Sequence, residues 1–207
     1  MATRAQDRTK ADDVTQAIAT DIQTGLLPPG TWLKQIDLQE RYGCTRLDVR
    51  RALDNLVLKR FVQHEQHRGY YVFRLEEPRV RENKQIRLIL ESAAAEGVAS
   101  RAAADDIARL EKRAAAFADA VRNGTLLSQF ETNNAFHREF YGLCGNSELA
   151  TLIGEFRSRG PAAPLTQWKS FARLEKSAAE HFEMIEAIKR RDISALKACI
   201  ERHLKQS

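Results

Sequence analysis

The chain has 207 residues, of which 43% are hydrophobic and 29% charged, and its formal net charge is +5. This composition is that of a globular protein and excludes a largely disordered chain. Charges break every apolar run before eighteen residues, which excludes a membrane helix, and residues 1–13 lack the apolar core of a secretory signal. We therefore expect a cytoplasmic protein with no membrane partner.

Three cysteines, Cys44, Cys144 and Cys199, lie far apart in the sequence and form no Cys-x-x-Cys pair. An odd number at such spacing argues against a disulfide framework and against a zinc ribbon. We expect buried or half-buried thiols.

The chain begins with a predicted helix followed by a turn. Apolar residues at four-residue steps predict a helix over residues 11–26, with a buried stripe that includes Leu26. The Pro-Pro-Gly sequence at 28–30 cannot continue a helix. We expect this turn to bring Trp32 and Leu33 onto a core.

Two shorter helices follow. The first is predicted over residues 35–42 and ends at Gly43, and the second begins after Thr45, with Asp48 three residues later as a weak capping-box signal. Its apolar residues recur at helical spacing and predict one buried face, made of Val49, Ala52, Leu53, Leu56 and Val57.

Basic residues gather at the start of this third helix. Residues 41–60 hold six basic and two acidic groups, and Arg46 and Arg50 project together because they are four residues apart. The positive end of the helix dipole disfavours such cations by roughly 0.3–1 kcal/mol each. Contacts with DNA phosphates and guanines would outweigh that cost. The alternative is a solvated face on which Arg50 pairs with Asp54.

The third helix is followed by a predicted hairpin. Residues 61–67 and 69–73 are rich in β-branched and aromatic residues and are separated around Arg68 and Gly69. Three helices and a hairpin in this order are typical of a winged helix-turn-helix, whose third helix enters the DNA major groove. Arg68 and Gly69 would then form a wing tip close to the minor groove. The alternative for Gly69 is a turn glycine without a ligand.

The remaining chain is predicted to be helical. Residues 74–83 are charged, contain a proline and are interpreted as a linker. The predicted helices after it cover residues 84–102, 104–123, 126–144, 147–158, 173–191 and 193–205. The fold class is therefore mainly α, with an N-terminal winged helix-turn-helix (residues 1–73) and an all-α helical bundle (residues 84–207).

Three histidines, His137, His181 and His203, fall on predicted helices of the bundle. A bundle can turn their imidazoles toward one site, which would suit zinc, nickel, copper or iron. Their spacing alone is equally compatible with hydrogen-bonded or surface histidines. Three histidines and an open position also describe catalytic zinc, so a small metal-dependent hydrolase is an alternative. Against it, Glu180 is adjacent to His181 and hence about 100° away around the helix, which leaves no obvious general base.

The N-terminal part also resembles a known family. The strings LLPPGTWL, LQERYGCTRLDVRRALDNL and HRGYYV, within residues 14–73, are similar to the DNA-binding domain of GntR-type bacterial transcription regulators. The resemblance implies that Arg46 and Arg50 read DNA, that Thr45 caps the helix and that Gly69 is the wing glycine. With the charge pattern, the candidate DNA-binding residues are Thr45, Arg46, Arg50, Arg51, Arg68 and Gly69.

The sequence departs from that pattern at three places. Leu47 and Asp48 stand where Thr-Pro is common, Arg51 stands where Glu is frequent, and Ile36 stands where some members carry an arginine. These departures concern the operator sequence rather than the fold.

Residues 84–205 resemble the FCD effector domain of the FadR branch of the GntR family. The matching features are Arg87 and Glu91, the strings NNAFH with CGN and EHFEMIEAI with RRD, and the final His203. The resemblance implies a divalent metal, zinc or nickel, held by an aspartate and three histidines, with a small carboxylate effector coordinated to it. Here the histidines would be His137, His181 and His203.

Asn133 stands where the aspartate is expected, one turn before His137. An amide oxygen can bind a cation but brings no charge, so it would be a weak ligand. Three outcomes stay open: three histidines with Asn133, three histidines with the effector alone, or no metal. Asn134 is a geometric substitute for Asn133.

Several further expectations follow for the effector and the partners. Arg87 is predicted to anchor an effector carboxylate, and its alternative is a surface ion pair with Glu91. Core packing is expected for Trp168, Phe171 and Phe182. A single winged helix reads one half-site, so we expect a homodimer on a near-palindromic double-stranded DNA operator, responsive to a small organic acid. The sequence thus predicts an effector-responsive transcriptional regulator rather than an enzyme.

Overall fold

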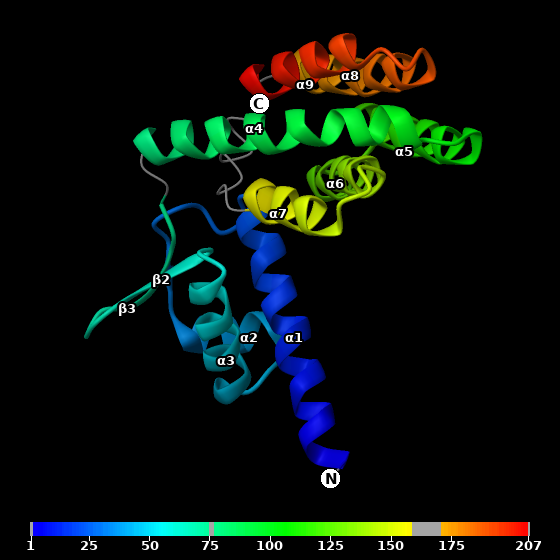
Figure 1. The fold of residues 1–207 in the computed structure, drawn as a ribbon. Coiled ribbons are helices and arrows are strands. Elements are labelled where there is room, and N and C mark those ends of the chain that lie inside the picture. Colours follow the sequence, from blue (N-terminus) through cyan, green and yellow to red (C-terminus); the bar gives the residue numbers. More distant parts are fainter. Residues whose placement is uncertain (1, 75–76, 159–170, 207) are drawn as a thin grey trace. The chain divides into compact units, whose positions relative to one another are not determined.

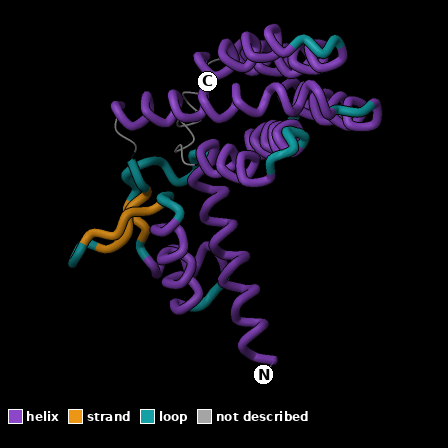
Figure 2. Tube along the Cα trace, viewed as in Figure 1, coloured by secondary structure: helices purple, strands orange, loops and turns teal. Residues whose placement is uncertain are grey.

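The computed structural model describes residues 2–74, 77–158 and 171–206. Residues up to 74 form a small α+β unit, the head, and residues from 77 onward form an all-helical unit, the body. Figures 1 and 2 show helices throughout and strands in the head alone among the described residues. The predicted fold class, a winged helix-turn-helix followed by a helical bundle, is confirmed. None of the helices in the described ranges is long and apolar enough to cross a membrane.

The head contains three helices and a three-stranded antiparallel sheet. Its elements are α1 (Ala2–Gln23), β1 (Trp32–Leu33), α2 (Gln35–Tyr42), α3 (Arg46–Leu58), β2 (Val62–Glu65) and β3 (Gly69–Val72). The strand order is β1-β3-β2, so the hairpin strand β3 lies in the middle. The register pairs Leu33 with Tyr70 and Val62 with Val72. These four side chains are buried and join the apolar faces of α1 and α3 in one core.

The start of the chain differs from the prediction in three details. Helix α1 begins at Ala2 rather than at residue 11. Helix α1 ends at Gln23, before the expected residue 26, and Gly25 then takes a positive φ of 77°. Leu26 is therefore 59% exposed, and Leu27 packs into the core in its place. Trp32 is also 53% exposed, because the alternation of strand β1 turns Leu33 inward and Trp32 outward.

The turn between α2 and α3 is built by a glycine and a capping box. Gly43 ends α2 in the left-handed region, with φ 58°. Thr45 then caps α3: its hydroxyl accepts from the Asp48 N–H, and the Asp48 carboxylate accepts from the Thr45 N–H at 3.0 Å. The predicted buried face of α3 is confirmed, with Val57 partly exposed. Asp48, at a position where the related family often has proline, thus has a structural role.

The body is a three-layer arrangement of helices. Its elements are α4 (Glu77–Arg101), α5 (Ala104–Asn123), α6 (Leu126–Gly142), α7 (Ser147–Ser158), α8 (Phe171–Lys189) and α9 (Ile193–Gln206). Helices α4 and α5 form the middle layer, with α8 and α9 on one side and α6 and α7 on the other (Figure 1).

The predicted linker is mostly helical. Helix α4 begins at Glu77 rather than at residue 84, so residues 77–83 belong to it, and residues 75–76 lie outside the described ranges. Pro78 does not prevent this, because it is the second helical residue, where an N–H has no partner within the helix. The proline that suggested a break therefore lies at a helix start.

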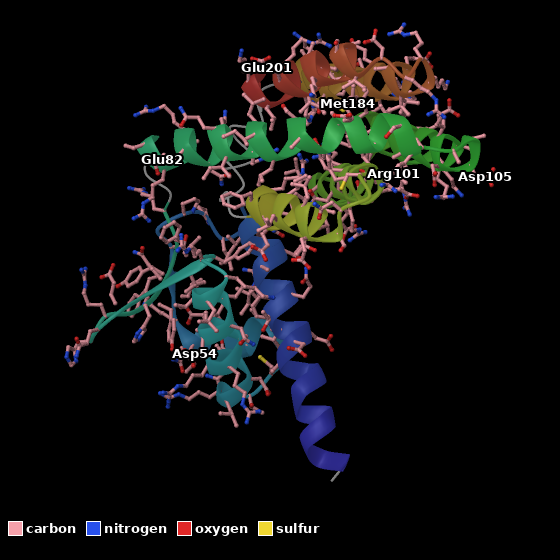
Figure 3. All side chains as sticks on the ribbon, viewed as in Figure 1. Asp54, Glu82, Arg101, Asp105, Met184 and Glu201 are labelled. Atoms are coloured by element: carbon pink, nitrogen blue, oxygen red, sulfur yellow. The ribbon has the colours of Figure 1, made fainter. Side chains whose placement is uncertain are left out.

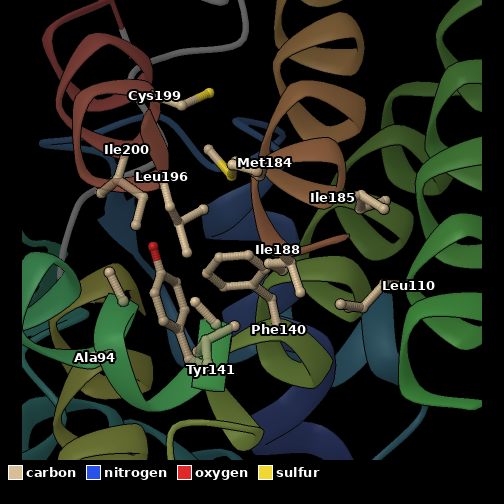
Figure 4. Packing of buried hydrophobic residues seen from close by; sticks show 14 of the residues in the cluster. Ala94, Leu110, Phe140, Tyr141, Met184, Ile185, Ile188, Leu196, Cys199 and Ile200 are labelled. Carbon is tan, nitrogen blue, oxygen red and sulfur yellow. The ribbon is translucent and has the colours of Figure 1, made fainter. Parts of the chain in front are cut away.

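The core of the body draws on all three layers. Figure 4 shows Met184 and Ile188 of α8 and Leu196 of α9 packed near Phe140 and Tyr141 of α6. Gly97 of α4 lets the backbone of Cys144 approach closely, because any Cβ at that position would collide with it. Two of the cysteines, Cys144 and Cys199, are buried and Cys44 is half-buried, as predicted.

Replacing Asp48 by alanine tests the capping box. We expect the variant to destabilise α3 by about 1 kcal/mol, because the Thr45 N–H loses its acceptor. Hydrogen exchange of the α3 amides, followed by mass spectrometry, should become about fivefold faster. Asp37→Ala, an exposed first-turn residue of α2, is the control and should change little. Equal protection in Asp48→Ala and the wild type would contradict this role.

Candidate functional site

The first two turns of α3 carry the basic cluster predicted from the sequence. Arg46, Arg50 and Arg51 are all exposed, and the Arg46 Nε lies 3.3 Å from Gln35 Oε1 at the start of α2. Thr45 is the N-cap residue, and its side chain is engaged with Asp48. Exposed guanidinium groups at the positive end of a helix can bind phosphates and guanine edges.

The hairpin tip has the geometry of a wing. A three-residue loop joins β2 to β3, and within it His67 takes a positive φ of 64°. Arg68 is exposed and pairs with Glu65 at 3.1 Å. Gly69 has φ 93°, and a Cβ there would lie 3.2 Å from the Trp32 Nε1. The positive φ favours glycine at this place, and a Cβ would in addition contact the Trp32 side chain tightly.

A hydrogen bond that sequence reasoning missed joins the wing to α3. The Tyr70 hydroxyl on β3 donates to Asp54 Oδ1 on α3 at 2.6 Å. Burial, and then this bond to Asp54, raise the pKa of Tyr70 to about 12, while the nearby Arg50 acts in the opposite direction. Asp54 is labelled on α3 in Figure 3. Asp54, the alternative partner considered for Arg50, thus accepts a hydrogen bond from the wing.

The three histidines of the body come together. His137 lies on α6, His181 on α8 and His203 on α9, and one ligand atom of each lies within 4.8 Å of the others. All three are buried. The two Nε2 atoms of His137 and His181 are 3.2 Å apart. Nitrogens bound to one zinc ion at about 2.0–2.1 Å would be about 3 to 3.4 Å apart, so this spacing fits a shared metal.

Burial keeps these imidazoles neutral. It is the main cause that lowers the pKa of His137, His181 and His203, and the positive charge of Arg157 lowers each pKa further. A neutral imidazole has a lone pair for a metal ion, whereas an imidazolium has none. The cluster is therefore in the protonation state that metal binding needs.

Glu180 orients the third imidazole. Its Oε2 lies 2.6 Å from His203 Nδ1, and Arg173 Nη1 lies 3.4 Å from the same oxygen. Burial opposes ionisation of Glu180, but His203 and Arg173 outweigh it and lower the pKa of the carboxyl. An ionised carboxylate only accepts, so His203 Nδ1 carries the hydrogen and Nε2 keeps a lone pair. This contact could not be predicted from the sequence, in which Glu180 is only the neighbour of His181.

Asn133 presents an unpartnered oxygen on the face of α6 that carries His137. Its Oδ1 is buried and has no hydrogen-bond partner in the described part of the chain. The same is true of Gln129 Oε1, one turn earlier. A buried acceptor without a partner is costly, and a bound cation or ligand would supply the missing contact. Between Asn133 and its half-buried neighbour Asn134, only Asn133 has such an oxygen.

Arg87 belongs to a second buried cluster next to the histidines. Its Nε lies 2.9 Å from Glu91 Oε1, so the pair expected from their spacing exists, but Glu91 is fully buried. Arg157 of α7 lies 3.4 Å from both Glu91 oxygens, and the Tyr141 hydroxyl donates to Glu91. The Tyr141 ring stacks on His137, with centroids 6.1 Å apart. Arg157, Arg173 and Tyr141 were not identified from the sequence, because they come from three different helices.

Charge around the histidines is positive overall. Three guanidinium groups (Arg87, Arg157 and Arg173) face two carboxylates (Glu91 and Glu180).

Two of the three aromatic residues that were expected to pack in the core are exposed. The exposed fraction is 54% for Phe171 and 39% for Phe182. Trp168 lies outside the described residues.

The head and the body each match a known protein family. The family model described as "Bacterial regulatory proteins, gntR family" matches residues 10–72, and the FCD domain model matches residues 84–206. The resemblance noted in the sequence is thereby confirmed over nearly the whole chain.

Individual relatives agree with that assignment. The HTH-type transcriptional repressor RspR of Escherichia coli K12 is 24% identical over 186 residues, which cover 90% of this chain and 82% of that protein. Among solved structures, that of E. coli McbR/YncC is similar to this chain with a TM-score of 0.83 at 21% sequence identity. The match covers 95% of this chain and 94% of the McbR/YncC chain. A GntR regulator of Rhodococcus sp. RHA1 has a TM-score of 0.79 at 17% identity, with the same coverage.

The two structures share the fold, while the matched families and the named relatives are regulators of transcription. The hydrolase alternative is therefore wrong. The exposed arginines of α3, the wing and the helical body are the parts of a DNA-binding transcription regulator, and the chain belongs to the GntR family with a C-terminal FCD domain.

Proposed function

We propose that this regulator binds a near-palindromic operator as a homodimer and that its FCD domain senses a small carboxylate at a divalent metal ion. The observation that carries the sensing part is the cluster of His137, His181 and His203, buried and with ligand atoms within 4.8 Å of one another. Three neutral imidazoles gathered in a protein interior are expensive unless they share a ligand.

The metal would be held by the three imidazoles, with Asn133 Oδ1 as a weak fourth ligand. Imidazole nitrogen suits zinc or nickel. When bound, the ion supplies an open coordination position for a carboxylate. The contribution of Glu180 is to fix the His203 tautomer, and that of the surrounding core is to keep water away.

Charge selects the kind of effector. Asn133 provides no negative charge, so a metal held here would keep its full charge and favour an anion. The guanidinium groups of Arg87 and Arg157 add to that preference, and Arg87 is the proposed second anchor for the effector. A small organic acid fits these conditions better than a neutral or cationic compound.

The dimer follows from the head. One winged helix presents one arginine-bearing turn and reads one half-site. A two-fold symmetric dimer reads two half-sites in opposite orientation, which makes the operator a near-palindrome. The exposed Arg46, Arg50 and Arg51 and the wing residues Arg68 and Gly69 are the proposed contacts.

Helix α4 offers a path from the sensor to the head. It begins at Glu77, close after the head, and carries Arg87 and Glu91 farther along. Arg87 is ten residues from that start, or about 15 Å along a helix. An effector that changes the contacts of Arg87 acts on the helix that leads to the head. We propose that this shifts the placement of the two heads in the dimer and thus the affinity for DNA.

Elemental analysis of protein purified without a histidine tag tests the metal site. We expect stoichiometric zinc or nickel in the wild type and its loss in His181→Ala, because two remaining imidazoles hold a metal poorly. His64→Ala, which removes an exposed histidine of the head, is the control and should retain the metal. A metal-free wild type that takes up neither ion on dialysis would refute the site.

A second variant refines that experiment. Asn133→Asp should hold the metal more tightly than the wild type in competition with a chelator, because a carboxylate adds a negative charge at the ligand position. Unchanged competition would remove Asn133 from the ligand set while leaving the three histidines in place.

Arg50→Ala tests the DNA contact. We expect specific binding to weaken by about 1–3 kcal/mol, or about 5- to 150-fold, because a bidentate base contact is lost. The measurement is fluorescence anisotropy at fixed salt with a duplex selected by the wild type. Arg138→Ala, an exposed arginine of α6, controls for the loss of one positive charge. Equal losses in both variants would show that Arg50 makes no specific contact.

A thermal-shift screen of organic acids, with and without divalent cations, tests the sensor. A true effector should raise the melting temperature only when the metal is present, with about 2.7 kcal/mol of stabilisation at a hundredfold excess over its dissociation constant. The same acid should change operator affinity. An acid that stabilises the body in this way and leaves DNA binding unchanged would argue against the switch.

A further inference from the structure

Leu47 is an exposed apolar residue in the middle of the DNA-reading turn. It is the second residue of α3, and 54% of its surface is accessible. Arg46 precedes it directly, and Arg50 and Arg51 follow three and four residues later.

Helix geometry places Leu47 at the centre of the exposed face. Successive residues are about 100° apart around a helix, and residues three and four apart are neighbours on its surface. The buried stripe of α3 runs through Val49 and Leu56. Leu47 lies on the opposite side, between the directions of Arg50 and Arg51. Arg46, Arg50 and Arg51 are thus its neighbours along this exposed face.

The neighbouring polar residues do not shield it. Asp48 is buried, and its carboxylate accepts hydrogen bonds from the Thr45 backbone and hydroxyl. Both side chains are committed to the cap of the helix. The surface near the N-terminal end of α3 therefore presents three arginines and the isobutyl group of Leu47.

Binding to DNA must cover that group. When Arg46 and Arg50 engage the duplex, the neighbouring Leu47 is removed from water. Opposite a polar base edge it would desolvate a donor or acceptor without replacing its hydrogen bond. The apolar group that base edges present in the major groove is the C5-methyl of thymine, a known partner of apolar side chains.

We propose that Leu47 reads thymine through an apolar contact with the C5-methyl group, beside guanines contacted by Arg46 or Arg50. Leu47 is then a specificity-determining residue for the DNA binding that the family establishes, and the proposal is independent of the metal and the effector. Threonine is common at this position in the GntR-type DNA-binding domains that the chain resembles. The leucine therefore gives this chain its own operator preference.

Replacing thymine by deoxyuridine removes only the methyl group and tests the contact directly. A duplex is first selected from a random library with the full-length wild-type protein, and each thymine is then replaced singly. At one or two positions in each half-site, the wild type should bind about fourfold more weakly, the equivalent of about 0.8 kcal/mol for one methyl group. Leu47→Ala should bind the thymine and deoxyuridine duplexes equally at those positions.

Leu58→Ala is the matched control. Leu58 is 82% exposed and lies on the same side of α3, but at its other end, so its loss should leave the thymine preference intact. Far-ultraviolet circular dichroism should show unchanged folding in both variants, because both side chains are exposed. The proposal is overturned if no single replacement affects the wild type, or if Leu47→Ala keeps the same preference as the wild type.

Discussion

The burial of three neutral imidazoles among arginine side chains is the constraint that shapes the body. Desolvation lowers the pKa of His137, His181 and His203, and the charge of Arg157 lowers each further. The protein tolerates this arrangement because Glu180 fixes one imidazole and the other two face each other at 3.2 Å. Several buried polar atoms nevertheless have no hydrogen-bond partner among the residues that the structure describes. These unsatisfied atoms support the proposal that a ligand completes the site.

The head also holds charges in an unfavourable place, but these charges are exposed. Cations at the N-terminus of a helix oppose its dipole, yet α3 places Arg46 and Arg50 there. The Thr45–Asp48 capping box strengthens this helix end, and Tyr70 binds Asp54 to hold the wing against the same helix. The capping box and the Tyr70–Asp54 hydrogen bond therefore both stabilise the helix that carries the arginines. Its exposed groups are available for DNA, which supplies the negative charge that the helix end lacks.

Both units rely on residues from separate elements that share one hydrogen-bonded carboxylate. Asp54 connects the wing to α3, and Glu91 connects Arg87 of α4 with Arg157 of α7 and Tyr141 of α6. Glu91 is buried and has several donors, so removing one partner would leave the others unpaired in the protein interior.

Local patterns in the sequence determined the helices, the hairpin, the arginine turn and the three histidines, because spacing along one element shows which side chains share a face. The start of α4 was misjudged, since Pro78 suits the first turn of a helix as well as a linker. Trp32 was misplaced because strand β1 forms only by pairing with β3. Only the tertiary structure brought Glu180 to His203 and Arg157 to Glu91, since contacts between helices depend on packing angles that no single segment encodes.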